Sequence, residues 1–201
     1  MPLSNVQKGA VGQYAFLSTA LATGGGQVEA YTPVADNEGR DSQIRRHLKP
    51  MPGISVQIKV AFYLAKDKLH GTRLSIVVNL PAKRVQKDPR FWYFFGFYDT
   101  SELRLHNPVF LVPSDVFHKQ GRARTVTKGR IWFVFSTNPG PESHDMWSPY
   151  RVAPKDLGKR LLEIIDSAGL TASEKAVPPP PDALWLGRKK VARTRRLRRA
   201  A

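Results

Sequence analysis

The chain has 201 residues, of which 41% are hydrophobic, and its 32 Lys and Arg against 16 Asp and Glu give a formal net charge of +16. This length suits one domain with a sizeable core, and the hydrophobic content excludes a wholly disordered chain. Cysteine is absent, which excludes disulfides and thiolate metal sites. No apolar run approaches the roughly 20 residues that span a bilayer, and no secretory signal is recognised, so we expect a cytoplasmic protein.

The elements predicted first are a helix and a strand. Apolar residues near a 3.6-residue period predict an amphipathic helix over residues 6–23, ended by three glycines at 24–26. Residues 27–34 alternate like a first strand, and the DNEG sequence at 36–39 predicts a turn.

Further strands and a last helix follow in the chain. Alternating or continuously apolar runs predict strands over 41–48, 54–65, 73–81, 91–99, 108–117 and 130–137. The 73–81 run is expected to pair with the two strands before it. A helix is predicted over 154–168, with Pro154 suited to its first position. Together these elements indicate an α/β or α+β domain, built on a mixed sheet of about six to eight strands.

The composition changes after Leu170. Residues 1–170 form the predicted domain, residues 171–187 a stiff proline-rich linker, and residues 188–201 a basic tail expected to be disordered until it meets a partner. The tail holds eight basic residues and no acid, which leaves residues 1–187 with 24 basic and 16 acidic residues and a net charge of +8. Both parts are basic, which favours a polyanionic partner, most often nucleic acid.

Three polar residues in the predicted strand pair carry the candidate chemistry. Gln57 and Lys59 lie two residues apart, so they project from one face of a strand while Val56, Ile58 and Val60 face the other way. If the preceding strand pairs antiparallel, Asp41 lies beside them. A carboxylate and an amide oxygen suit a hard cation, and a nearby ammonium stabilises charge on a phosphate under attack. Alternating polar residues are also common on exposed strands, so the spacing alone does not decide between the two readings.

The order of helix, strand, turn, acidic strand and a strand with [D/E/Q]-x-K resembles the PD-(D/E)XK nuclease superfamily. The string YTPVADNEGRDSQI followed by VQIKV is similar to its QxK branch, found in restriction-type and homing endonucleases and in uncharacterised bacterial restriction-endonuclease-like domains. The likeness covers about residues 8–118 and extends towards 168. It implies a restriction-endonuclease-like mixed sheet flanked by helices, and a metal-dependent endonuclease.

The resemblance also implies roles for individual residues. Asp41 would be the metal-binding acid, Gln57 and the backbone carbonyl of Ile58 further ligands for Mg²⁺ or Mn²⁺, and Lys59 the catalytic lysine. One feature departs from the family. Members usually carry a Glu on the first helix, and GQYAF places Phe16 where that Glu is expected. Asp36 or Glu38 in the predicted turn could supply the missing carboxylate, although turn formation alone also explains them.

The leading hypothesis is a nuclease that acts on DNA and is associated with it in the cytoplasm, with a homodimer favoured if it cuts both strands. The nucleic-acid-binding residues expected for it are Arg45, Arg46, Lys49, Arg188, Lys189, Lys190, Arg193, Arg195 and Arg196. Two alternatives stay open at this point. One is a catalytically degenerate nucleic-acid-binding module on the same scaffold. The other is an unrelated α/β domain that the basic tail alone tethers to a polyanion.

Overall fold

The computed structural model describes residues 3–33, 40–49, 52–67, 71–85, 88–121, 124–127 and 129–171. The described helices are α1 (Asn5–Thr23), α2 (Ser114–Gln120) and α3 (Leu157–Thr171), with 3-10 turns η1 (Ala82–Arg84), η2 (Ser148–Tyr150) and η3 (Pro154–Asp156). The described strands are β1 (Val28–Tyr31), β2 (Ser42–Arg46), β3 (Ile54–Ala61), β4 (Ala65–Asp67), β5 (Gly71–Pro81), β6 (Phe91–Asp99), β7 (Arg104–Leu105), β8 (Val109–Pro113), β9 (Arg124–Thr127), β10 (Arg130–Thr137) and β11 (Arg151–Val152).

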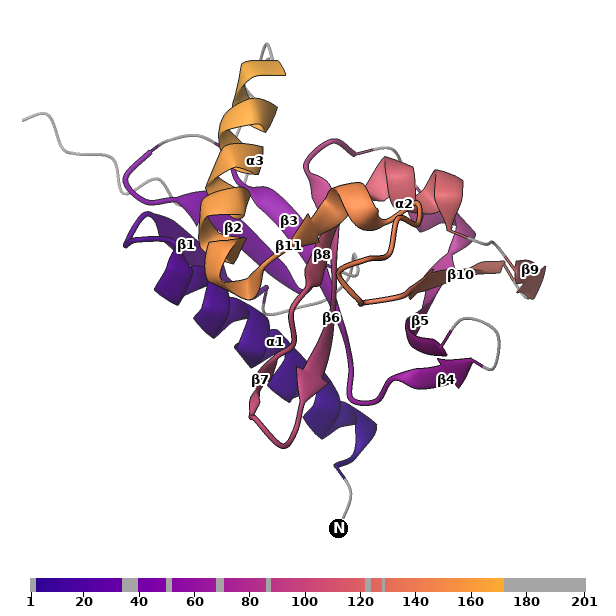
Figure 1. Cartoon of the computed structure of the whole chain (residues 1–201). Coiled ribbons are helices and arrows are strands. Elements are labelled where there is room, and N and C mark those ends of the chain that lie inside the picture. Colours follow the sequence, from indigo (N-terminus) through magenta and orange to yellow (C-terminus); the bar gives the residue numbers. More distant parts are fainter. Residues whose placement is uncertain are drawn as a thin grey trace, which may run out of the picture.

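These elements form two sheets (Figure 1). The larger sheet has the order β1-β2-β3-β6-β8-β11, with β7 also paired to β6. Its β3 and β6 run parallel, and the other strand pairs described in this sheet are antiparallel. The smaller sheet has the order β4-β5-β10-β9 and is antiparallel. The predicted α+β class with a mixed sheet and flanking helices is therefore confirmed.

Helices α1 and α3 cover one face of the larger sheet (Figure 1). Ser4 caps α1 by accepting a hydrogen bond from the Gln7 backbone N–H, and the Gln7 side chain accepts one from the Ser4 backbone. Phe16 of α1 is fully buried, and its ring lies 4.7 Å from that of Phe94 on β6. Val56 and Ile58 of β3 belong to the same core, so they face the helices, on the side of β3 away from Gln57 and Lys59 that the alternation predicted.

The opposite face of the larger sheet packs against the smaller sheet and α2 through a second, largely aromatic core. Tyr93 and Phe95 of β6 contribute to it, and the Phe95 ring stacks on Phe135 of β10 at 4.1 Å. The strand FWYFFGFYD thus has a different apolar layer on each face, which explains its nearly continuous apolar sequence.

Two sequence-based expectations were wrong. The strand predicted over 73–81 is β5, but it pairs with β4 and β10 rather than with β2 and β3. The buried side chains of β5 all lie on one face of the strand. That face packs against the aromatic core, so β5 belongs to the layer facing the larger sheet and does not extend that sheet. The strand predicted over 108–117 stops at Pro113, and α2 begins at Ser114. Asp115 favours the first turn of that helix because a carboxylate there interacts well with the helix dipole.

The helix predicted from Pro154 starts with the 3-10 turn η3 at that residue. The α-helix α3 follows this turn directly, from Leu157. The predicted linker and tail, residues 172–201, lie outside the described residues. In the part of the chain that the structure describes, no helix is both long and apolar enough to cross a membrane.

Candidate active site

Asp41 precedes β2 and is held by contacts on both its backbone and its side chain. Its Oδ2 accepts a hydrogen bond of 2.7 Å from the backbone N–H of Ile58 on β3. Its backbone carbonyl accepts hydrogen bonds from the side chains of Gln13 on α1, at 3.0 Å, and Ser42, at 2.8 Å. The carboxylate is therefore fixed against the middle of β3, where the sequence predicted it would lie.

Gln57 directly precedes Ile58 on β3 and is buried. Its side chain is only 5% exposed, and its Oε1 has no hydrogen-bond partner among the described residues. A buried amide oxygen without a partner costs free energy, and native proteins seldom leave one so. A cation ligated by this oxygen would remove that cost, because amide carbonyls are good ligands for hard divalent cations.

Lys59 follows Gln57 on the same face of β3, about 7 Å further along the strand. It is half-buried, and no ion pair is found for it within the described ranges. Its register partner on β6 is Phe95, so the base of the side chain lies beside the aromatic core. An ammonium in this position retains its donors for a bound anion.

The backbone of Ile58 separates Gln57 from Lys59. The N–H and C=O of one strand residue point to the same side, and the Ile58 N–H points to Asp41. The Ile58 carbonyl therefore also faces the Asp41 side of β3. This direction agrees with the expected role of that carbonyl as a ligand.

Tyr93 is a neighbour that the sequence did not assign to the site. It is the register partner of Gln57 on β6 and is fully buried. Burial raises the pKa of its phenol, and the negative charge of Asp41 raises it further, so Tyr93 stays neutral. Its hydroxyl lies 3.0 Å from Nε2 of His118 on α2. Only the register of β3 with β6 reveals that Tyr93 borders Gln57.

The residue of α1 that reaches the site is Gln13, not Phe16. Phe16 points into the helix-side core, where a carboxylate would be buried among apolar groups. Gln13 lies three residues earlier, on the side of the helix that contacts Asp41. The sequence from Gly9 to Gln13 reads G-x-x-x-Q, which resembles the G-x-x-x-E pattern in which members of the superfamily carry the Glu of the first helix, and this is the signal that could have identified Gln13.

The candidate donors for a metal ion are thus one carboxylate, an amide oxygen and a backbone carbonyl. Asp36 and Glu38, the expected auxiliary acids, lie outside the described residues. Among the residues that are described, no group of three or more His, Cys, Asp and Glu could hold a metal ion. All three donors are oxygens, which fits Mg²⁺ or Mn²⁺ and gives a site with a single negative charge.

The basic residues predicted to bind nucleic acid have different surroundings. The Arg46 side chain is 19% exposed and forms an ion pair of 2.7 Å with Asp166 on α3, so it joins β2 to that helix. Arg45 is exposed on the opposite face of β2, with its guanidinium 5.4 Å from the ring centre of Tyr31. Lys49 is exposed beyond β2. The tail residues from Arg188 to Arg196 lie outside the described part of the chain.

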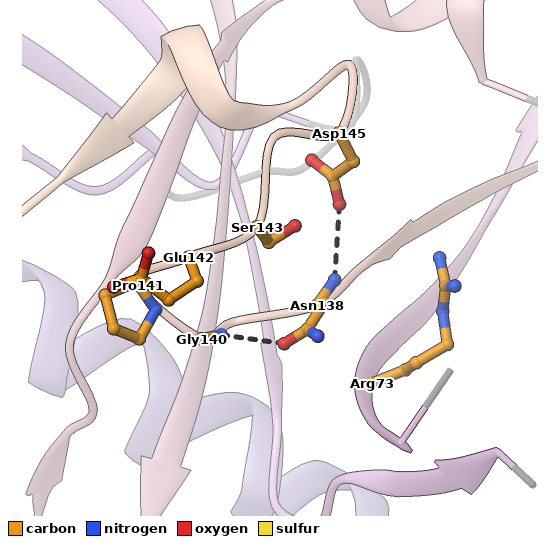
Figure 2. Close-up of a pocket in the computed structure, with 7 residues that line it drawn as sticks. All are labelled: Arg73, Asn138, Gly140, Pro141, Glu142, Ser143 and Asp145. Carbon is orange, nitrogen blue, oxygen red and sulfur yellow. Dashed lines mark hydrogen bonds between the residues drawn. The ribbon is translucent and has the colours of Figure 1, made fainter. Parts of the chain in front are cut away.

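A pocket of about 460 Å³ lies elsewhere, in the loop that follows β10 (Figure 2). Asp145 accepts hydrogen bonds there from the Thr137 hydroxyl, at 2.6 Å, and from the backbone N–H groups of Asn138 and Trp147. Arg73 donates to the hydroxyl and carbonyl of Ser136. These polar groups satisfy one another, which explains the shape of the loop without a ligand.

No protein-family model matches the chain, and no curated protein matches it by sequence. Among solved structures, the fold is similar to that of a bacterial homing endonuclease, I-Ssp6803I. The two chains are 14% identical, the match covers 84% of this chain and 98% of that chain, and the TM-score is 0.47.

The environment of Gln57 predicts how its substitution changes the response to divalent cations. Gln57→Met keeps the volume of the side chain but removes the partnerless oxygen, so the fold should keep or gain stability without metal. Millimolar Mn²⁺ should raise the Tm of the wild type, and this increase should largely vanish in the variant. Thermal unfolding with and without Mn²⁺ measures both effects. An equal Mn²⁺ response in the two proteins would show that Gln57 is not a ligand.

Proposed function

We propose that the domain is a metal-dependent nuclease of the PD-(D/E)XK type with a QxK site, and that it hydrolyses DNA phosphodiesters. The observation that carries this proposal is the buried, partnerless Oε1 of Gln57 between Asp41 and Lys59 on paired strands. A structural role alone would favour an apolar residue at that position.

Each residue has a distinct role in the proposed reaction. Asp41, Gln57 and the Ile58 carbonyl would hold Mg²⁺ or Mn²⁺, which when bound supplies Lewis-acid stabilisation of the phosphate. Lys59 would place its ammonium against the phosphate and stabilise the charge that develops as water attacks. Tyr93 would act as a neutral wall that keeps Gln57 oriented and limits the access of bulk water.

Substrate would approach over the open face of β1 and β2. Glu29, Tyr31, Gln43 and Arg45 share this face, and Gln43 is the register partner of Ser55, two residues before Gln57. Tyr31 is 48% exposed and Arg45 is exposed, whereas the corresponding face of β6 is buried beneath the smaller sheet. The open face therefore leads directly to the candidate site. The basic tail would add sequence-independent affinity for the phosphate backbone.

Plasmid nicking with Mg²⁺ or Mn²⁺ tests the proposed activity. The wild type should convert supercoiled plasmid, and Lys59→Ala should lower the rate about 100-fold or more because the developing phosphate charge loses its cation. Asp41→Asn should be similarly impaired. Lys159→Ala, which removes an exposed lysine of α3, should cut at the wild-type rate. If the wild type and Lys59→Ala nick equally, the activity belongs to a contaminant and the proposal fails.

A binding module without catalysis is the second candidate, favoured by the single carboxylate of the site. Gln13→Glu distinguishes the two. The new carboxylate would lie near Asp41 and strengthen cation binding, so a weak enzyme should become active at lower Mg²⁺ concentrations, by about tenfold. Mg²⁺ titration of plasmid nicking measures this shift. A chain that binds DNA but stays inactive in both forms, at every Mg²⁺ concentration, would be the binding module.

The open face predicts a local effect of Arg45. In a Lys59→Ala background, which removes cleavage from the measurement, Arg45→Ala should weaken duplex binding severalfold and lower the salt dependence by about one phosphate contact. Fluorescence anisotropy at several salt concentrations measures both. Arg160→Ala removes an exposed arginine of α3 that pairs with Glu163, and it should bind as the parent does. Equal losses of duplex affinity in the two variants would mean that DNA is attracted by the overall positive charge of the chain and not by a contact at Arg45.

A further inference from the structure

The outer face of the smaller sheet, the one turned away from the aromatic core, carries exposed apolar side chains at its centre. Trp132 on β10 is 43% exposed and Val77 on β5 is 51% exposed. Val77 is the register partner of Val134, which follows Trp132 by two residues on β10. Because side chains two residues apart share one face of a strand, the three lie together on that face. We call them the Trp132 patch.

The fold does not account for this patch. The inner face of β5 and β10 supplies the apolar contacts that hold the smaller sheet in place, through residues such as Val78 and Phe133. Strand propensity does not require apolar residues on the outer face either, because Thr satisfies it there as well. Single exposed apolar residues are ordinary, whereas a contiguous group with polar neighbours is typical of a contact surface.

A cation lies beside the indole of Trp132. Arg130 is exposed and precedes Trp132 by two residues, so it shares the outer face. Its guanidinium donates hydrogen bonds to the side-chain and backbone oxygens of Asn79, at 2.8 and 3.1 Å, and Asn79 is the register partner of Trp132. Within the described ranges no carboxylate pairs with Arg130, so neutral groups orient this cation and its charge stays available to an anion.

The sequence of this sheet adds to the positive charge. Strands β5, β9 and β10 contain no Asp or Glu, and the run GRARTVTKGR that leads into β10 holds four basic residues and no acid. At the other end of the patch, Arg73 donates to the hydroxyl and the carbonyl of Ser136. That end borders the pocket lined by Glu142 and Asp145 (Figure 2), so the Arg130 end is the more positive of the two.

An exposed indole with an uncompensated arginine beside it is complementary to a polyanion that also presents flat apolar groups. In a duplex the faces of the bases are covered by neighbouring base pairs, whereas in a single strand they stack on aromatic side chains while arginines bind the phosphates.

We propose that the Trp132 patch binds a single nucleic-acid strand, with a base stacked on Trp132 and a phosphate held by Arg130. The two valines of the patch would contact the neighbouring base. The patch lies on the face of the smaller sheet opposite the aromatic core and shares no residue with the candidate active site. The proposal therefore does not depend on nuclease activity.

Fluorescence anisotropy of the full chain with a labelled oligothymidine of about 12 nucleotides, in the absence of divalent cations, tests the patch. Trp132→Ala should weaken binding about tenfold because one base loses its stacking partner, and Trp132→Phe should keep most of the affinity. Tyr14→Ala, which removes an aromatic side chain that is 72% exposed on α1, should bind as the wild type does. A duplex of the same length should bind the wild type and Trp132→Ala alike, because its base faces are covered.

An oligouridine of the same length separates RNA from DNA through the 2′-hydroxyl, and a Trp132-dependent affinity for either strand supports the proposal. A wild type that binds neither strand would overturn it. Equal affinities of the wild type, Trp132→Ala and Tyr14→Ala would also overturn it, as would an equal loss of duplex and single-strand affinity in Trp132→Ala.

Tryptophan fluorescence provides a second test that does not rely on a loss of binding. The chain has four tryptophans, and a base stacked on Trp132 should quench the emission of that one. Unlabelled oligothymidine should therefore quench the wild type, while Trp132→Phe should still bind the strand and lose most of the quenching. Equal quenching in the two proteins would show that the strand lies against another tryptophan, which contradicts the proposal.

Discussion

The hydrogen bond from the Ile58 backbone N–H to the Asp41 carboxylate organises the candidate site. In a regular antiparallel ladder this N–H would bond a carbonyl of the neighbouring strand. Here the carboxylate of Asp41, the residue directly before β2, takes the place of that carbonyl. The negative charge is therefore fixed against the centre of the sheet. The Gln57 and Lys59 side chains flank the same peptide unit, so the position of one carboxylate relative to β3 decides whether the three groups can act together.

The two layers around the larger sheet explain why such a polar group lies inside the fold. Helices α1 and α3 cover one face, whereas the smaller sheet covers the other face over β6, β8 and the end of β3 at Ala61. The site lies at the boundary where that covering ends and the open face of β1 and β2 begins. Burial orients Gln57, and the neighbouring face of β1 and β2, which carries Tyr31 and Arg45, is exposed.

Much of the fold could be predicted from local patterns. The period of α1, the alternation of β2 and β3, and the apolar run of β6 each determine one element almost by themselves. The partner of β5 could not be predicted, because one-sided burial is compatible with either sheet. The shared face of Gln57 and Lys59 followed from strand alternation, and the position of Asp41 followed from antiparallel pairing of the two strands. The positions of Gln13 and Tyr93 could not be predicted. Their proximity depends on how α1 approaches Asp41 and on the register of β3 with β6, which are tertiary features.

The proposed site requires that Gln57 Oε1 and Asp41 bind the same divalent cation, and a crystal soaked in Mn²⁺ would show whether they do. The anomalous signal of Mn²⁺ should lie about 2–2.5 Å from an Asp41 carboxylate oxygen and from Gln57 Oε1, with the Ile58 carbonyl as a further ligand. A Gln57 Oε1 that is instead hydrogen-bonded to the protein or to an ordered water, with Mn²⁺ bound elsewhere, would show that these two residues do not form a cation site.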